Sequence, residues 1–493
     1  MTSATEPARV EASRWTPMVR AMSKTGGASI ASGLVSALGT KIVATVLGPG
    51  SVALLATLQQ LRDGAIVAAT ANGRTALVQG ASELETVGRR EYLRTVAILF
   101  AGGTLLVALA MLAAPREIVR WSRLPQSGEP LLAWLAVTVV LLSLFVFLTA
   151  VLNSLKEIGK LAWLQLASPV VAAMVAWPLA WEVRAGHPVA LVFFLAIPAA
   201  ATVVAASVAL AGHRERLHEW FQGPGRWWTA GAARHFFSIS GAMLASGLAA
   251  TTVLLAVRAS ITRQESLAMT GQFDAAWNIS MNQVTLILGS VQTYYLPSLA
   301  SARTGSERVA QMRSMLLVAT LATVPAIVAL AALKPLAVSV LYSHAFAASP
   351  GFLRWTLVGD FLKVSAWVLA TPMLATRDLG AFLTFDLMTH ATFFGAAMLL
   401  ARILEPAEGA AIGFLVAYAV YFALCYGRAR ARYGFRFGAA GLSAWLLGLA
   451  LIAGASAHAW SDVTVHFARA SAWMLLAIGF SGGFAVYMRR REA

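Results

Sequence analysis

The chain has 493 residues, of which 58% are hydrophobic and 12% are charged, and its mean hydropathy is +0.70. This composition excludes a soluble globular protein of the same length and indicates a protein that crosses a membrane many times. The 38 Lys and Arg residues exceed the 22 Asp and Glu residues, which gives a net charge of +16. In a membrane protein such an excess follows from topology, so we expect no nucleic-acid partner.

Fourteen apolar runs are each about 20 residues long, which is enough to cross the hydrocarbon core as a helix. The runs are continuous and do not alternate with polar residues, which indicates helices and excludes the strands of a barrel. The predicted spans cover residues 28–47, 51–72, 93–114, 130–152, 161–182, 188–211, 236–258, 272–296, 314–333, 353–375, 380–401, 407–427, 438–457 and 468–488.

The longest connection between spans, residues 212–235, is basic and rich in Trp, with Gly-Pro-Gly at its centre. It separates two sets of six spans, residues 28–211 and 236–427, which enter the membrane in the same direction because six is even. We therefore expect two six-helix bundles joined by a cytoplasmic linker. Residues 1–27 are predicted to form a cytoplasmic tail, and residues 428–493 a basic loop, an extra transmembrane hairpin and a basic C-terminus.

Lys and Arg are concentrated in the connections on the side of the N-terminus, which places both termini in the cytoplasm by the positive-inside rule. We interpret these arginines as topology determinants near anionic headgroups, without a role in substrate binding. The residues that carry most of the bias are Arg89, Arg90, Arg94, Arg214, Arg216, Arg428, Arg430, Arg432, Arg489, Arg490 and Arg491.

Sequence signatures of enzymes are missing. The chain has no Walker motif, no His-Glu-x-x-His and no Asp-x-Asp, and most connections are short. ATP hydrolysis and hydrolytic chemistry are therefore not expected, and the lack of a large loop argues against a membrane polysaccharide polymerase or ligase. The single cysteine, Cys425, excludes an intrachain disulfide.

Polar side chains inside the first two spans share a face. Gln59, Arg62 and Asp63 stand at positions i, i+3 and i+4, so one side of a helix carries an amide and charges of both signs and cannot face lipid. Lys41 lies within the first span, seven residues before the Gly-Pro-Gly turn that starts at Gly48. It either snorkels to the interface as an anchor or lines a cavity.

The later spans carry more ionisable groups. Asp360 and Lys363 lie three residues apart, so they either pair or point together into a polar cavity, and charges within hydrocarbon are functional candidates. Asp386 and His390, at i and i+4, either relay a proton or form a static hydrogen bond. Asp274, Asn278 and Asn282 follow one face of their span and predict either a water-filled lumen or a seam of interhelical hydrogen bonds.

Several short motifs together carry a resemblance to one transporter family. They are Lys41-Ile-Val-Ala-Thr-Val-Leu-Gly-Pro-Gly50 followed by Gln59-Gln60-Leu61, the pair Asn72-Gly73, Arg258 thirteen residues before Gly271, Tyr295-Leu296-Pro297, Leu357-Val358-Gly359-Asp360-Phe361-Leu362-Lys363, and Ala417-Tyr418 with Tyr421-Phe422. Over roughly residues 24–435 the chain resembles the polysaccharide transporter family of Wzx-type flippases. It is most similar to the translocases for O-antigen and enterobacterial common antigen lipid-linked oligosaccharides.

The resemblance implies an all-α fold of the multidrug and oligosaccharidyl-lipid exporter superfamily, to which MATE transporters belong. In that fold two six-helix bundles face a central cavity that opens alternately to either side. The implied cargo is an undecaprenyl-pyrophosphate-linked oligosaccharide, flipped from the cytoplasmic to the periplasmic leaflet of a bacterial inner membrane. The hairpin after residue 435, which gives fourteen spans, and the long polar tail depart from the family pattern.

On this interpretation the spans supply two groups of site residues. Cations would compensate the pyrophosphate, and the remaining polar groups would line the cavity or exchange a coupling ion. The predicted cations are Lys41, Arg62, Arg258 and Lys363. The predicted polar and ion-coupling residues are Gln59, Asp63, Asp274, Asn278, Asn282, Asp360, Asp386 and His390.

The resemblance also implies partners and leaves alternatives. We expect no resident cofactor or metal, a coupling ion that is H⁺ or Na⁺, and a monomer surrounded by membrane lipids. A polysaccharide polymerase and a chain-length regulator are the expected protein partners. A lipid II flippase and a MATE-type multidrug or cation exporter are the competing transport functions, and a membrane polysaccharide polymerase is the competing function from another class.

Overall fold

The computed structural model describes residues 6–84, 86–125, 128–302, 304–376, 378–458 and 463–492. Within these residues the chain forms helices and contains no strand. The helices are α1 (Glu6–Ala69), α2 (Arg74–Glu83), α3 (Thr86–Ala113), α4 (Pro115–Ser122), α5 (Glu129–Ser154), α6 (Ile158–Arg184), α7 (Ala190–Ala211), α8 (Arg214–Gln222), α9 (Ala230–Gln264), α10 (Leu267–Ser301), α11 (Gly305–Ala332), α12 (Lys334–Leu341), η2 (His344–Phe346), α13 (Ser349–Ala375), α14 (Leu379–Leu400), α15 (Pro406–Tyr433), α16 (Ala439–Ala457) and α17 (Val463–Glu492).

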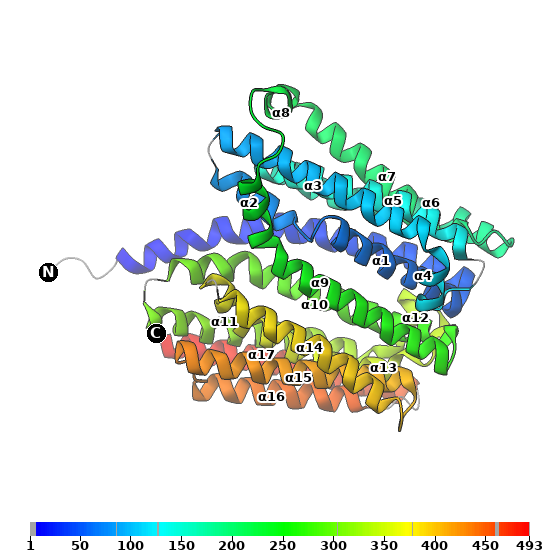
Figure 1. Ribbon diagram of the computed structural model, residues 1–493. Helices are drawn as coiled ribbons and strands as arrows, with labels where there is room; N and C mark the ends of the chain where they lie inside the picture. Colours follow the sequence, from blue (N-terminus) through cyan, green and yellow to red (C-terminus); the bar gives the residue numbers. More distant parts are fainter. Residues whose placement is uncertain are drawn as a thin grey trace.

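The long helices run side by side in two groups (Figure 1). We call α1 to α7 the N-lobe and α9 to α17 the C-lobe. Helix α1 packs against α6 in the N-lobe and against α9 and α10 in the C-lobe, so the two lobes meet along α1. The linker helix α8, the start of α1 and the end of α17 lie at the same end of the molecule, on the left of Figure 1, which we call the linker end.

Helix α1 reverses its direction at Gly48, the one residue within it that has non-helical geometry (φ 74°, ψ −177°). Before this point Ser32 Oγ donates to Gln165 O of α6 over 3.3 Å. After it, contacts with α9 run antiparallel, from Gln60 beside Thr251 O to Asn72 beside Met243 O. The predicted turn is therefore present, at the opposite end of the molecule from the linker, which we call the Gly48 end.

A close approach of two backbones joins the lobes at the Gly48 end. A Cβ atom added to Gly271, in the first turn of α10, would lie 1.9 Å from the carbonyl oxygen of Pro49. A contact this short is impossible for any side chain, so the residue must be glycine for α10 to rest on the turn of α1. The same turn needs glycine at residue 48, because its positive φ is unfavourable for other residues.

The fourteen predicted spans are confirmed as long helical segments among the described residues: the two halves of α1, then α3, α5, α6, α7, α9, α10, α11 and α13 to α17. By length and hydropathy the described residues contain 12 candidate membrane spans, because the two halves of α1 count as one and α10 is too polar to qualify. Four shorter helices, α2, α4, α8 and α12, were not predicted. Residues 6–27 of the predicted tail continue helix α1, and residues 1–5 lie outside the described part.

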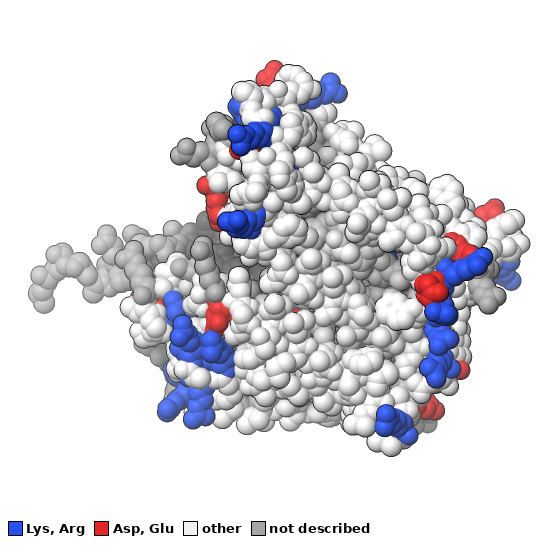
Figure 2. All heavy atoms as spheres, in the orientation of Figure 1, with Lys and Arg blue, Asp and Glu red and all other residues white. Residues whose placement is uncertain are grey.

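The distribution of charge fits a membrane protein. Figure 2 shows Lys, Arg, Asp and Glu gathered at the two ends of the visible face, with a broad uncharged band between them. Large apolar side chains are exposed within the long helices, as at Leu105, Leu106 and Leu109 of α3. Exposed leucines at successive turns are costly in water and favourable in hydrocarbon. Which end faces the cytoplasm stays a prediction.

The extra hairpin formed by α16 and α17 is part of the C-lobe, where it packs against α11 and α13. Trp445 Nε1 of α16 donates to Ser365 Oγ of α13 over 2.9 Å, and Ser481 Oγ of α17 donates to Leu321 O of α11 over 2.9 Å. The first of these hydrogen bonds is made to α13, the helix that carries two of the predicted site residues, and the second to its neighbour α11. The hairpin therefore supports the C-lobe and is not a separate appendage.

A buried lysine fixes the C-terminal end of α16. Lys334, 4% exposed, donates from Nζ to Ser456 O over 2.6 Å, and an ammonium at the last carbonyls of a helix complements the helix dipole. Its position lies between the spans of α11 and α13. Burial, and to a smaller extent the charge of Arg354, lowers the pKa of Lys334 from 10.5 to about 8.

Candidate functional site

The two lobes meet at a buried ion pair. Arg258 Nε of α9 donates to Asp274 Oδ1 of α10 over 2.6 Å, and the side chains are 5% and 0% exposed. Arg258 Nη1 also donates to Gln60 Oε1 over 3.0 Å and to Ala56 O over 3.4 Å, both on α1. The guanidinium is thus neutralised within the C-lobe and hydrogen bonded to the N-lobe.

The carboxyl group of Asp360 is completely buried in the middle of α13. Ser280 Oγ of α10 donates to its Oδ2 over 2.7 Å, and its Oδ1 is buried without a hydrogen-bond partner among the described residues. A buried carboxylate with so few partners is costly unless it takes up a proton or a cation. The chemistry of this position is therefore suited to exchange of H⁺ or a small cation.

The ammonium of Lys363 has aromatic and sulfur neighbours. Its Nζ lies 3.2 Å from Met281 Sδ and 5.1 Å from the ring centroid of Tyr418, with Phe414 at 5.9 Å. Among the described residues no carboxylate forms an ion pair with it. The direct pair with Asp360, one of the two predicted arrangements, is not formed, because residues three apart on a helix differ by about 60° in direction and the carboxyl group turns to Ser280.

Asp386 and His390 of α14 are in contact, as their spacing predicts. Their Oδ2 and Nε2 atoms lie 3.5 Å apart, and the side chains are 17% and 19% exposed. Ser246 Oγ of α9 donates to the same Asp386 oxygen over 2.5 Å. The carboxylate is thus held by a hydroxyl and an imidazole from two helices, while both side chains keep some access, which a proton relay requires.

The charged face in the second half of α1 is partly neutralised within itself. Arg62 Nη2 pairs with Asp63 Oδ1 over 2.8 Å, and the two side chains are 22% and 51% exposed. Gln59 is half-buried on the same helix. Its neighbour Gln60, which was not among the predicted site residues, accepts the hydrogen bond from Arg258. The predicted face therefore lies beside the interface between the lobes, and the direct contact comes from the adjacent residue.

Lys41 joins two helices in this structure. Its Nζ donates to the backbone carbonyl of Ser339 in α12 over 2.5 Å. The contact joins α1 to the C-lobe near the Gly48 turn, and it uses the ammonium on a neutral acceptor. A contact with a protein carbonyl is neither of the two predicted roles, so the anchor at the membrane interface and the cavity residue both stay predictions.

The polar face of α10 is divided along its length. Asp274 is bound to Arg258, and the half-buried side chain of Asn278 lies near Tyr342 at the end of α12. Asn282, one turn further along, is exposed. Near the Gly48 end this face thus carries an interhelical hydrogen bond, at Asp274, and the water-filled lumen stays a prediction.

Three contact residues were missed by sequence reasoning: Gln60, Ser246 and Ser280. The serines each donate to a buried or half-buried aspartate from another helix. A single serine in an apolar span is common, and neither periodicity nor charge distinguishes it. Gln60 could have been found, because it belongs to the Gln59-Gln60 pair in the recognised motif.

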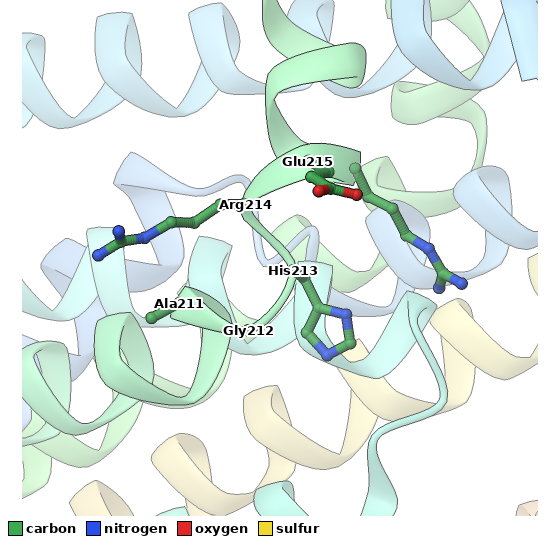
Figure 3. A pocket seen from close by; sticks show the side chains of 6 residues that line it. Ala211, Gly212, His213, Arg214 and Glu215 are labelled. Carbon is green, nitrogen blue, oxygen red and sulfur yellow. The ribbon is translucent and has the colours of Figure 1, made fainter.

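A surface pocket of about 430 Å³ lies elsewhere, at the turn between α7 and α8. Figure 3 shows that Arg214, His213 and Glu215 point in different directions there, so no set of polar groups converges on one point. Within the described part of the chain no group of three or more His, Cys, Asp or Glu residues could hold a metal ion. The pocket is lined by Ala211, Gly212, His213, Arg214, Glu215 and Arg216.

Comparison with known sequences gives two kinds of match. The model of a family described as "Polysaccharide biosynthesis protein" matches residues 73–350. The lipid III flippase of Escherichia coli (strain K12) is 27% identical over 203 residues, which is 41% of this chain and 48% of that protein. The lipid III flippase of Shigella flexneri aligns with the same values. The matched region thus spans about half the length of these relatives.

Comparison with solved structures shows the fold. The inward closed conformation of the lipid II flippase MurJ has a TM-score of 0.71 at 13% identity, covering 95% of this chain and 99% of that one. An inward-facing multidrug resistance MATE family transporter of the MOP superfamily has a TM-score of 0.67 at 13% identity, covering 81% and 94%. The predicted fold class, an all-α membrane protein of the MATE-like type, is confirmed.

Proposed function

This chain belongs to the polysaccharide biosynthesis protein family, and from that premise we propose that it is a flippase for a lipid-linked oligosaccharide. It moves an undecaprenyl-pyrophosphate-linked O-antigen or exopolysaccharide repeat unit from the cytoplasmic to the periplasmic leaflet of a bacterial inner membrane, by alternating access. The lipid III flippases among its relatives and the MurJ-like fold support a cargo of this class. The chain acts as a transporter without covalent chemistry.

The observation that carries the proposal is the state of Lys363. It is a half-buried ammonium beside two aromatic rings, and among the described residues no carboxylate forms a direct ion pair with it, while the charges of Asp360 and Asp386 act on it from a longer distance. A charge in that position is costly unless an anion joins it. A pyrophosphate supplies that anion, and lysine is well suited to phosphate as a compact, mobile point charge. The proposed role of Lys363 is to bind the diphosphate of the cargo.

The other predicted cations have different roles in this proposal. Arg258 and Lys41 hold the Gly48 end closed through hydrogen bonds between the lobes, and Arg62 is balanced by Asp63. Asp274 keeps the guanidinium of Arg258 neutralised when no cargo is present. The cations that hold the lobes together are thus separate from the one that meets the cargo.

Coupling to H⁺ or Na⁺ is proposed for two carboxyl groups of the C-lobe. Asp360 has a buried oxygen without a partner, and Asp386 is bound to His390 and Ser246. Uptake of a cation at either position changes the charge near Lys363, which changes the affinity for an anionic headgroup. The direction of transport is then set by the gradient of that ion.

Two experiments test the proposal. After deletion of the gene in its source organism, we expect the lipid-linked oligosaccharide to accumulate in the inner leaflet and the surface glycan to be lost. A normal leaflet distribution with intact surface glycan, in a strain without a second copy, would overturn the proposed function. Accumulation of lipid II with arrested wall synthesis would identify the lipid II alternative, and unchanged glycan with drug sensitivity would identify an exporter.

The second experiment separates Lys363 from other lysines. We expect Lys363→Gln to abolish complementation of the deletion strain and Lys363→Arg to retain part of it, since the positive charge is kept. Lys156→Gln, which removes an exposed lysine between α5 and α6, is the matched control and should complement fully. Full complementation by Lys363→Gln at normal protein level would contradict the assigned role.

A further inference from the structure

The linker between the lobes is held firmly by α3. Arg94, 1% exposed, donates from Nε to Trp220 O over 2.8 Å, from Nη2 to Gly223 O over 2.6 Å and from Nη1 to Gly225 O over 3.0 Å. Its guanidinium also lies 5.3 Å from the ring centroid of Trp227. The sequence predicts a topology determinant at this arginine, and the structure adds that it binds three backbone carbonyl groups of the linker.

Other side chains from the start of α3 complete the attachment. Arg90 forms an ion pair with Glu219 of α8, and Glu91 Oε1 accepts from the backbone N–H of Arg226 over 3.1 Å. Thr95 Oγ1 accepts from the backbone N–H of residue 229 over 3.1 Å. A flexible connection between lobes would not need such contacts. The backbone that carries the exposed linker side chains is therefore held in place.

Those exposed side chains are of two types, aromatic and basic. Trp220 is turned inwards, with 5% exposure, whereas Trp227 and Trp228 are 52% and 48% exposed. The acidic side chain of Glu219 is already paired with an arginine of α3. The exposed arginines between the end of α7 and the start of α9 are Arg214, Arg216 and Arg226.

The linker lies at the edge of the uncharged band. Figure 1 shows α8 and the loop after it beside the ends of α3 and α7, and Figure 2 shows charged side chains gathered at this end of the molecule. If the uncharged band spans the hydrocarbon core, its edge lies at the depth of the lipid headgroups. Half-exposed indoles are favourable there and unfavourable in bulk water, and arginines there meet lipid phosphates.

We propose that the linker face formed by Trp227, Trp228, Arg214, Arg216 and Arg226 is a docking surface for anionic glycerophospholipid headgroups. The indole rings rest at the level of the glycerol backbone, and the guanidinium groups bind the phosphates. Charge selects the occupant, because three exposed arginines stand against two exposed acids, Glu215 and Glu219, and Glu219 is already paired with Arg90; the remaining positive charge favours an anionic lipid over a zwitterionic one. Adjacent indoles at the edge of the apolar band favour a lipid over a nucleic acid or an acidic protein segment. This inference does not depend on the proposed cargo.

The test measures the thermal stability of the full purified chain in a neutral detergent. Phosphatidylglycerol and phosphatidylcholine with identical acyl chains are added in turn, and soluble glycerol 3-phosphate is added as a free anion. We expect a larger increase in Tm with phosphatidylglycerol than with phosphatidylcholine, and no increase with glycerol 3-phosphate. At roughly 10-fold higher salt the difference between the two lipids should be lost, because the Debye length shortens and exposed charges are screened.

Matched variants locate the binding surface. The triple variant R214Q/R216Q/R226Q should lose more than half of the difference between the two lipids. The triple variant R116Q/R120Q/R263Q, which makes the same charge change at the Gly48 end, should keep it. R214K/R216K/R226K should also keep it, since lipid attraction depends on charge. If the triple glutamine variant does not fold, the single variants R214Q, R216Q and R226Q decide the question, because each should lose part of the difference. Equal shifts with the two lipids in the unmodified protein, or equal losses in both glutamine variants, would overturn the proposal.

Discussion

Removal of one partner of the Arg258–Asp274 pair tests how the lobes are held together. In Asp274→Asn the guanidinium stays buried, with 5% exposure, and keeps only the neutral acceptors Gln60 and Ala56 O on α1. Breaking a buried pair in this way typically costs about 3–5 kcal/mol, because an uncompensated charge is left inside. Arg258→Gln should cost a similar amount, since Asp274 is then buried without a cation.

The pair formed by Arg62 and Asp63 is a matched control on α1. Its side chains are 22% and 51% exposed, so solvent screens the interaction. Pairs of this kind contribute about 0–1 kcal/mol. We therefore expect Arg62→Gln to change the free energy of unfolding by less than a third of the loss in Asp274→Asn. The two values are measured by equilibrium unfolding of purified variants in mixed micelles.

The double variant R258Q/D274N completes the test. Because no uncompensated charge remains in it, we expect its loss of stability to be smaller than the sum of the two single losses. Additive losses, or a loss in Asp274→Asn no larger than that in Arg62→Gln, would refute the conclusion that burial makes this ion pair important.

Three further predictions concern other positions. In Asp360→Asn combined with Lys363→Gln, we expect complementation no better than in the worse single variant, since the two groups do not pair; recovery in the double variant would show that they do. Gly271→Ala should destabilise by about 1–3 kcal/mol because its Cβ would overlap a carbonyl of α1, whereas Gly102→Ala, with open space around it, should be neutral or stabilising. Lys334 loses its proton near pH 8 in the folded protein and near pH 10.5 in the unfolded chain, because burial lowers its pKa. The free energy of unfolding should therefore rise by up to about 3 kcal/mol between these two pH values, relative to Lys334→Met. Identical pH profiles of Tm in the two proteins would contradict this.

The sequence allowed the helices to be predicted but not their contacts. Fourteen long helical segments follow from apolar runs, because each span must satisfy its own backbone in lipid and so carries its own signal. The contact of Asp386 with His390 also follows from spacing on a single helix. The partners of Asp360 and Arg258 lie 80 and 198 residues away, at Ser280 and Gln60. Such contacts depend on which helix faces lie together, and local spacing contains no information on that.

The failed pairing of Asp360 with Lys363 shows the same limit on a smaller scale. Spacing of three residues permits an ion pair, but a nearby hydroxyl from α10 competes for the carboxyl group, and aromatic rings on α15 compete for the ammonium. The short helices α2, α4, α8 and α12 were missed for a different reason. They contain 8 to 10 residues, too few to show an apolar periodicity that differs from a loop.

The hydrogen bonds that Arg258 and Lys41 make between the lobes at the Gly48 end each join a cation to a neutral acceptor, which lowers the cost of separating the lobes during alternating access. Arg258 and Asp274 both belong to the C-lobe, so their charges stay together when the lobes separate. Besides the longer hydrogen bond from Arg258 to Ala56 O, the contacts that must break are those of Arg258 with Gln60 and of Lys41 with Ser339, in which a cation donates to a neutral acceptor. Each such bond contributes about 1.5–3 kcal/mol, so the two together cost about 3–6 kcal/mol. Binding of cargo or a coupling ion with a micromolar dissociation constant releases about 8 kcal/mol. If the ligand binds the open state much more tightly than the closed state, this free energy exceeds the cost of breaking the two hydrogen bonds and shifts the equilibrium to the open state. A salt bridge between the lobes would raise that cost, because separation would leave two charges without partners.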